Sequence, residues 1–134
     1  MKRAINRQKF DRCALEQELL DHHSIRWRTY SRLGLLFKTR HLYEEFSPYS
    51  EQKVLFLHPA VFSIIRFLEN GRRRILCLHN VSNRYQEAVI DIPPYQKKPF
   101  SGIREIISRQ LLVLNKRSAV SLKPYQTKWL LLDG

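Results

Sequence analysis

The sequence has little of what a self-contained catalytic site is usually built from. It holds four glycines and two cysteines in 134 residues, and nothing in it resembles a glycine-rich loop that cradles a phosphate group. The Gly-x-Ser-x-Gly spacing of a nucleophilic serine elbow is absent. So are Cys-x-x-Cys and His-x-x-x-His, two spacings that present ligands to zinc. We therefore expect no metal site, no cofactor and no nucleophilic catalytic residue.

Long apolar runs are also missing. No run approaches the roughly 20 apolar residues that a helix needs to cross a bilayer. The chain begins with basic residues, Lys2 and Arg3, but polar residues follow where a secretory signal needs an apolar stretch. Cys13 and Cys77 lie in segments of different periodicity, which favours two buried free thiols over the alternative of a disulfide. We expect a cytoplasmic protein with no membrane partner.

Acidic residues are scarce, because 12 Asp and Glu stand against 24 Lys and Arg, a formal net charge of +12. Such a balance is compatible with binding to nucleic acid, an anionic membrane surface or an acidic substrate. It is equally compatible with a piece of a protein whose acidic partner surface is missing. No nucleic-acid-binding signature accompanies the charge, so a small basic module that binds nucleic acid or another anionic surface is the alternative interpretation. The basic runs are Arg72-Arg73-Arg74, Lys97-Lys98, Lys116-Arg117 and the arginines of a predicted helix.

What is present indicates a folded protein whose N-terminal part is helical. Hydrophobic residues make up 43% of the chain, with 7 Phe, 6 Tyr and 2 Trp. Asp11 is placed to cap a helix that runs to Leu20, and Ser24 to cap a longer one that runs to about Glu45. Pro48 ends the helical region, because proline lacks the amide hydrogen and disfavours helical geometry in the residue before it. The apolar stripe of the longer helix consists of Tyr30, Leu33, Leu36, Phe37 and Tyr43.

After Pro48 the pattern changes to short runs of Val, Ile, Leu and Phe separated by turn residues. One gap holds Asn70-Gly71, a pair that supplies the positive φ of tight hairpin turns. About seven such runs predict an antiparallel β-sandwich. The expected strands are 53–57, 61–68, 74–79, 87–92, 110–114, 119–122 and 127–132. The expected core comprises Phe56, Val61, Ile64, Leu76, Leu78, Val89, Ile90, Val120 and Trp129, of which about half face inward.

Histidines and helical carboxylates are the remaining candidates for chemistry, and both have ordinary interpretations. His22 and His23 are adjacent and cannot both face one metal from a regular helix, and the other histidines, His41, His58 and His79, have no ligand partner at helical spacing. Glutamate at a solvent-facing helical position is usually a helix former rather than a catalyst. The helical carboxylates are Glu16, Glu18, Glu44 and Glu45.

Several stretches, in order along the chain, resemble sucrose phosphorylase and its relatives in the α-amylase superfamily. Residues 3–7, Arg-Ala-Ile-Asn-Arg, resemble a loop after the last strand of that family's (β/α)8 barrel, and residues 11–46 resemble the helices that close the barrel. Residues 61–66 and 74–82 are similar to the first hairpin of its C-terminal β domain. Residues 122–130, Leu-Lys-Pro-Tyr-Gln-Thr-Lys-Trp-Leu, resemble its closing strand.

The resemblance implies a mainly β chain, an antiparallel β-sandwich of the α-amylase C-terminal-domain type preceded by two α-helices left from a (β/α)8 barrel. The implied domains are 1–47, the terminal loop and helices of a truncated barrel, and 48–134, the sandwich, which packs on the barrel. Family members are retaining enzymes that use two carboxyl groups. Those carboxyl groups lie upstream, because a whole barrel of about 250 residues does not fit before residue 48. The expectation is a non-catalytic C-terminal fragment of a glucosyl-transferring enzyme that acts on α-glucosides.

One site residue carries over from the family. Arg3 matches an arginine that helps to hold the glucosyl unit, a task suited to the fork of donors on a guanidinium group. Sugar and phosphate would reach the protein only through the missing barrel, and we expect no binding by Arg3 alone. A further alternative, a carbohydrate-binding module, requires aromatic side chains exposed on one face. Its candidates are Tyr49, Tyr85, Tyr95 and Tyr125.

Overall fold

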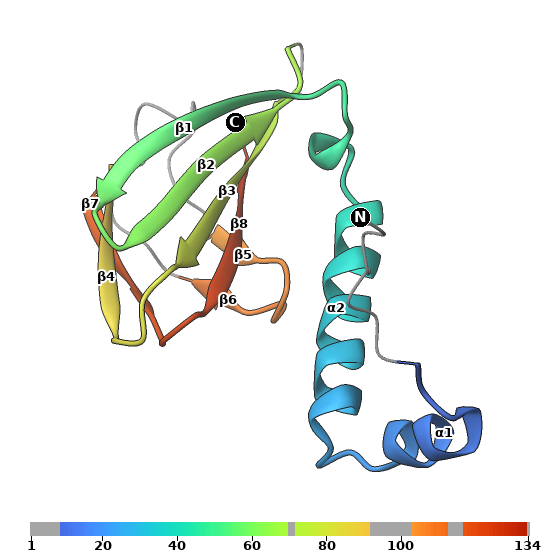
Figure 1. The fold of residues 1–134 in the computed structure, drawn as a ribbon. Coiled ribbons are helices and arrows are strands. Elements are labelled where there is room, and N and C mark those ends of the chain that lie inside the picture. Colours follow the sequence, from blue (N-terminus) through green and yellow to red (C-terminus); the bar gives the residue numbers. More distant parts are fainter. Residues whose placement is uncertain (1–8, 70–71, 92–102, 113–116, 134) are drawn as a thin grey trace, which may run out of the picture. The chain divides into compact units, whose positions relative to one another are not determined.

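A computed structural model of the chain describes residues 9–69, 72–91, 103–112 and 117–133. Two helices come first, followed by a short 3-10 helix and strands (Figure 1). The chain divides into two compact units, Met1–Lys38 and Thr39–Gly134.

The helices begin where the capping residues predict. α1 spans Arg12–Leu20, and the Asp11 side chain accepts a hydrogen bond from the Ala14 amide at 3.0 Å. α2 spans Ile25–His41, and Ser24 Oγ accepts from the Trp27 amide at 3.0 Å. Each contact satisfies one of the amides left free at a helix start. The first helix thus has its predicted bounds, and the second has its predicted start.

The end of the second helix differs from the prediction. α2 stops at His41, and a separate 3-10 helix, η1, spans Glu44–Phe46. The amide of Leu42 bonds to the Thr39 carbonyl and that of Tyr43 to the Arg40 carbonyl, at 3.1 and 3.4 Å. These bonds reach back three residues instead of four, which tightens the last turn and ends the helix. The predicted boundary at Glu45 was therefore four residues too late.

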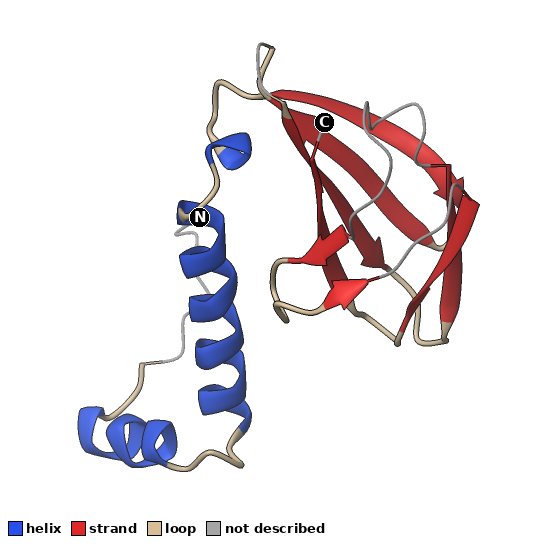
Figure 2. Ribbon diagram, turned by 180° about the vertical axis from the view of Figure 1, so that it is seen from behind, coloured by secondary structure: helices blue, strands red, loops and turns tan. Residues whose placement is uncertain are grey.

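Two antiparallel sheets form the rest of the second unit (Figure 2). The larger has the strand order β1-β2-β3-β8-β5-β6, and the smaller pairs β4 with β7. Consecutive strands β1, β2 and β3 are neighbours, as short hairpin connections favour. The bounds are β1 Glu51–His58, β2 Val61–Phe67, β3 Arg73–Asn80, β4 Gln86–Asp91, β5 Ile103–Glu105, β6 Leu111–Leu112, β7 Arg117–Leu122 and β8 Thr127–Asp133.

The core lies between the two sheets and follows the alternation of strand side chains. Leu76 and Leu78 of β3 pair in register with Leu130 and Lys128 of β8, and Leu130 is fully buried with them. The smaller sheet contributes Ala88, Ile90, Val120 and Leu122 to the same cluster. The predicted mainly β fold, an antiparallel sandwich after two helices, is confirmed.

Two predicted core residues are wrong. Phe56 is 99% exposed, because it lies between Leu55 and Leu57, which both pack against the core. Val89 is 43% exposed, because it lies between Ala88 and Ile90, which both face the core. Ile64 is half-buried, whereas Val61, Leu76, Leu78, Ile90, Val120 and Trp129 are buried as expected.

Most strands lie within two residues of the prediction, with two exceptions. β5 was missed, and the expected strand 110–114 is only Leu111–Leu112 in the part that the structure describes. The described residues therefore hold eight strands instead of about seven. β2 and β3 form the expected hairpin, while Asn70-Gly71, predicted as its turn, lies outside the described residues.

Candidate functional site

A short segment between α2 and β1 covers the face of the larger sheet that points away from the core. We call residues 43–50 the strap; it contains η1 and lies against β2 and β3. Ile75 and Cys77 alternate with core residues on β3 and so face the strap side, yet they are 0% and 3% exposed. The ring centroids of Phe46 and Trp129 lie 4.5 Å apart. The strap therefore helps to close a second, smaller apolar cluster.

Arg66 of β2 fastens the strap to the sheet. Its guanidinium group donates to the carbonyls of Glu45 and Ser47 at 2.9 and 3.0 Å, and to Ser50 Oγ at 2.7 Å. A fourth bond, at 2.8 Å, reaches Gln52 Oε1 on β1. A planar fork of donors is suited to several acceptors at once, so one side chain fixes the path of residues 45–52.

Glu45 is the one carboxylate of the predicted helical group that the structure buries. Its side chain is 2% exposed, and Oε1 accepts from Arg73 Nε at 3.0 Å. Oε2 has no hydrogen-bond partner among the described residues, and neither has the buried indole Nε1 of Trp129. The prediction of a solvent-facing glutamate is thus wrong for Glu45. A carboxylate closed off from solvent and held by an arginine is placed to hold structure rather than to react with a substrate.

The thiol and the histidine on this face are both shifted by burial. Burial raises the pKa of Cys77 to about 12, a rise that the nearby positive charge of Arg66 partly offsets. Cys77 is therefore a neutral, unreactive thiol. Burial also lowers the pKa of His79, whose Nδ1 lies 3.1 Å from Thr127 Oγ1. Both cysteines are free, as expected, but Cys13 is exposed instead of buried.

The other sequence candidates do not converge on a catalytic site. His58 Nδ1 accepts from the Ala60 amide at 3.1 Å, and His22 stacks on Trp27 at 4.3 Å. The described residues contain no group of three side chains able to hold a metal ion. Arg3, the predicted sugar-binding residue, lies outside the described residues.

Several arginines of the basic runs have partners within the chain. Arg73 pairs with Glu45, and Arg74 lies over the Phe67 ring at 5.5 Å. In the helical unit, Arg26 pairs with Glu18 and lies over Phe10 at 4.6 Å. Because these arginines make contacts within the chain, fewer of them are available to bind an external anion. Lys97, Lys98 and Lys116 lie outside the described residues.

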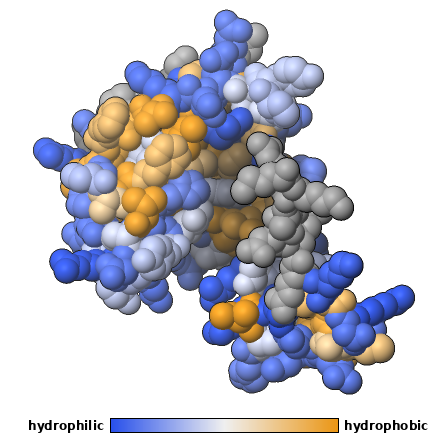
Figure 3. Space-filling view, in the orientation of Figure 1, coloured by the Kyte–Doolittle hydropathy of each residue, from blue (hydrophilic) through white to orange (hydrophobic). Residues whose placement is uncertain are grey.

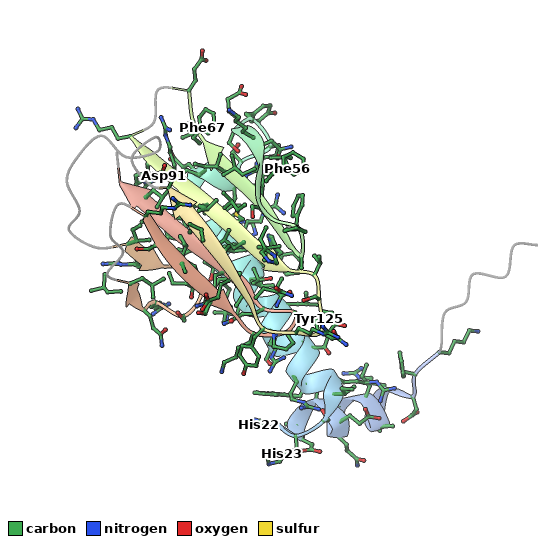
Figure 4. The ribbon with its side chains drawn as sticks, turned by 90° about the vertical axis from the view of Figure 1, so that its left-hand side faces the viewer. His22, His23, Phe56, Phe67, Asp91 and Tyr125 are labelled. Carbon is green, nitrogen blue, oxygen red and sulfur yellow. The ribbon has the colours of Figure 1, made fainter. Side chains whose placement is uncertain are left out.

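Apolar side chains are exposed on the outside of β1 and β2 (Figure 3). Phe56 projects from β1 (Figure 4), and Val54 and Phe62 are 50% and 48% exposed. Together with Val81 they line a shallow groove that runs along residues 54–63. An exposed cluster of this kind marks a surface that binds another surface.

The helical unit is more exposed still. α1 has no buried residue, and α2 buries only Thr39. The predicted stripe is on the surface, with Tyr30, Leu33 and Phe37 exposed by 70%, 48% and 58%. A stable amphipathic helix buries its apolar stripe, and the described part of the helical unit, residues 9–38, supplies no cover for the stripe of α2.

The strand arrangement is that of the β-sandwich at the C-terminal end of α-amylase-type enzymes, and the comparisons agree. No known family model matches the chain. It is 30% identical over 135 residues to a glucosylglycerate phosphorylase of Spirochaeta thermophila, an alignment that covers 97% of this chain and 23% of that protein. The chain thus spans less than a quarter of this relative. The resemblance to the C-terminal portion of α-amylase-superfamily proteins is confirmed.

Solved structures share the fold at low sequence identity. An Anoxybacillus α-amylase aligns with a TM-score of 0.64 and 12% identity, over 84% of this chain and 24% of that one. The maltogenic α-amylase AmyB of Thermotoga neapolitana aligns at 0.55 and 17% identity, over 74% and 24%. AmyP in complex with maltose aligns at 0.59 and 12%, over 72% and 18%.

None of the described helices is long and apolar enough to cross a membrane.

Proposed function

We propose that this chain is the C-terminal portion of a sucrose-phosphorylase-like enzyme that transfers the glucosyl unit of an α-glucoside. The relative with 30% identity is a glucosylglycerate phosphorylase, which supports a substrate of the glucoside class and phosphate as acceptor. The chain itself supplies no catalytic carboxylate in this proposal. Its role is to cover and stabilise a (β/α)8 barrel.

The exposed stripe of α2 is the observation that carries this proposal. A helix of 17 residues with one buried side chain has no core of its own, and two helices cannot bury an apolar stripe on both sides. The barrel would supply the missing surface, and the apolar groove along β1 and β2 offers it a further contact. The excess of basic residues would face acidic groups on that partner.

The proposed division is a barrel-derived part, 1–47, and a sandwich, 48–134. The boundary between the two compact units lies earlier, between Lys38 and Thr39. It lies before residue 47 because the strap contacts the sheet and so belongs to the second unit. Arg3 would lie in the loop that contributes to the donor subsite, where its guanidinium group would bind sugar hydroxyls. Cleavage in such an enzyme proceeds through a covalent glucosyl intermediate with retention, so the phosphorolysis product is α-glucose 1-phosphate.

The test begins with the native protein in its source cells, detected through the peptide of residues 75–84. We expect a product several times heavier than 16.1 kDa, which releases α-glucose 1-phosphate from sucrose or glucosylglycerate when phosphate is present. In that product Arg3→Ala should lower the rate, and Lys2→Ala should leave it unchanged. A product of 16.1 kDa that has no barrel-containing partner chain would overturn the proposal. So would a heavy product that is inactive on every α-glucoside tested.

A salt titration separates this function from the basic-module alternative. Phosphate contacts weaken steeply with ionic strength, so we expect any binding of this chain to a nucleic-acid duplex to disappear at physiological salt. A nucleic-acid affinity that survives physiological salt would favour the alternative.

A further inference from the structure

Gly34 lies inside α2, where a helical backbone has no need of glycine. A glycine inside a helix is destabilising relative to alanine, because it has more backbone freedom to lose on folding. Crowding does not require it either, since a Cβ built on Gly34 would meet no atom within 4 Å among the described residues. The described part of the chain therefore does not account for a glycine at this position.

Aromatic side chains flank Gly34 on the exposed apolar side of α2. Phe37 follows it by three residues, Tyr30 precedes it by four and Trp27 by seven, so all of them share one face of the helix. Together with Gly34 they line a groove on the helix surface. We call this groove the Gly34 notch. The rings form its sides, and the missing Cβ lowers its floor to the helix backbone.

The charge of α2 and the size of the relative indicate which partner fits the Gly34 notch. α2 carries several basic residues and no acidic one, so a second copy of the same helix would bring like charges together. The matched portion makes up 23% of the Spirochaeta relative, and more than three quarters of that protein lies outside it. A different part of one larger protein therefore suits the notch better than a second copy of this chain.

We propose that Gly34 is the point where α2 comes closest to the barrel, and that the Gly34 notch receives one branched apolar side chain from the outer face of the barrel sheet. The partner rests on the proposed function. The helices of a (β/α)8 barrel form a ring around its strands, and such parallel strands are rich in Val, Ile and Leu on both faces.

The Gly34 notch thereby sets the distance at which α2 packs. A methyl group on residue 34 would occupy the space of the incoming side chain and hold the helix away from the strands, as an extra methylene does in a packed core. Alanine at this position is thus favoured by the helix alone and disfavoured by the assembled protein. This opposition of signs is the property to test.

The test compares Gly34→Ala in two proteins by hydrogen exchange at the amides of α2. In the 134-residue chain, at low protein concentration, exchange should become roughly two- to fivefold slower, because alanine is the better helix former. In the barrel-containing protein the same change should make exchange about fivefold faster or more, and should lower the urea midpoint. Gly34→Leu should act in the same two directions, with the larger loss in the barrel-containing protein.

Thr29→Ala is the matched control. Thr29 is exposed and precedes Gly34 by five residues, which places it on the other side of the helix. Its replacement by alanine also raises helix propensity, so exchange should become slower in both proteins. The reversal of sign should belong to Gly34 alone. Slower exchange of Gly34→Ala in both proteins would overturn the notch, and so would the absence of slowing in the 134-residue chain.

Activity of the barrel-containing protein separates this proposal from the proposed function. A protein that releases α-glucose 1-phosphate and is stabilised by Gly34→Ala would overturn the Gly34 notch and leave the function in place. A protein that is inactive on every α-glucoside, yet is destabilised by Gly34→Ala, would do the reverse. A native product of 16.1 kDa with no barrel-containing partner chain would overturn both.

Discussion

Several side chains on the strap side of the sheet are both buried and polar. Whether they stabilise or destabilise the fold therefore depends on their partners. Glu45 is nearly inaccessible, and Arg73, itself 45% exposed, is its single ion-pair partner among the described residues. A carboxylate left in such a place without a donor keeps its desolvation penalty and loses its compensation. Removing Arg73 alone should therefore destabilise the fold more than removing Arg73 and neutralising Glu45 together.

We expect Arg73→Ala to lower the free energy of unfolding by roughly 2 to 3 kcal/mol, the cost of an unpaired buried carboxylate. Glu45→Gln in the Arg73→Ala background should recover part of that loss, because a neutral amide is cheaper to bury. The measurement is urea unfolding followed by tryptophan fluorescence. Arg72→Ala serves as the control, since Arg72 is exposed. An Arg73→Ala protein as stable as the control would show that the pair does not stabilise the fold.

His79 makes stability depend on pH. Burial lowers its pKa in the folded state, so the unfolded chain binds a proton more readily at mildly acidic pH. Stability contributed by the neutral ring is present above the ordinary histidine pKa and is lost as pH falls through and below it. We expect the urea midpoint of the wild type to fall between pH 7.5 and 5.5, and that of His79→Gln to fall less. Equal slopes in the two proteins would contradict the assignment.

Among the elements, the strap stands out because one side chain fixes it. Residues 43–50 have little regular structure beyond the three residues of η1, so Arg66 replaces the backbone bonds that a strand or helix would supply. Its four acceptors belong to four different residues. A lysine carries the same charge but cannot match a planar fork.

We therefore expect Arg66→Lys to be destabilising by about 1 to 3 kcal/mol, nearly as much as Arg66→Ala, since the unmet acceptors matter more than the charge. Hydrogen exchange should locate the loss, with faster exchange at the amides of Phe46, Ser47 and Ser50. Full rescue by lysine would mean that charge, rather than geometry, holds the strap.

Local signals predicted the elements better than they predicted which residues are buried. Asp11 and Ser24 predict the starts of the two helices, because a capping side chain bonds to an amide only three residues further along the chain. The exposure of Phe56 could not be predicted, because Leu55, Phe56 and Leu57 are all apolar and their sequence does not show which face of the strand is buried. The burial of Glu45 depends on Arg73, 28 positions away, and β5 is too short for alternation to appear. Arg3, the one site residue taken from the resemblance, stays a prediction.

At the scale of the whole molecule, the described residues form a buried core between the two sheets, and the helical unit has no such core of its own. The cluster between the sheets involves both of them, whereas the stripe of α2 has no cover within the described residues of its own unit. A protein with such a stripe associates through it when its partner is missing.

We expect the isolated chain to self-associate, and Leu33→Ser with Phe37→Ser to reduce the association without loss of the sandwich. Analytical ultracentrifugation measures the first effect, and the urea midpoint of the β unit the second. Arg32→Ser with Lys38→Ser, on exposed polar positions of the same helix, is the matched control. A wild-type chain that stays monodisperse at high concentration would contradict the expectation.

The strap also decides where the sandwich can be separated from the rest of the chain. The change of periodicity suggests a cut at Pro48, but that cut removes Glu45 and Phe46. Ile75, Cys77 and Trp129 would then lose a cover that helps to keep them from water, and Arg66 would lose two backbone acceptors. A cut before Tyr43 leaves all of these contacts in place. The unit that can be transplanted or recombined as a whole therefore starts at the beginning of the strap, near Tyr43, and not at Pro48.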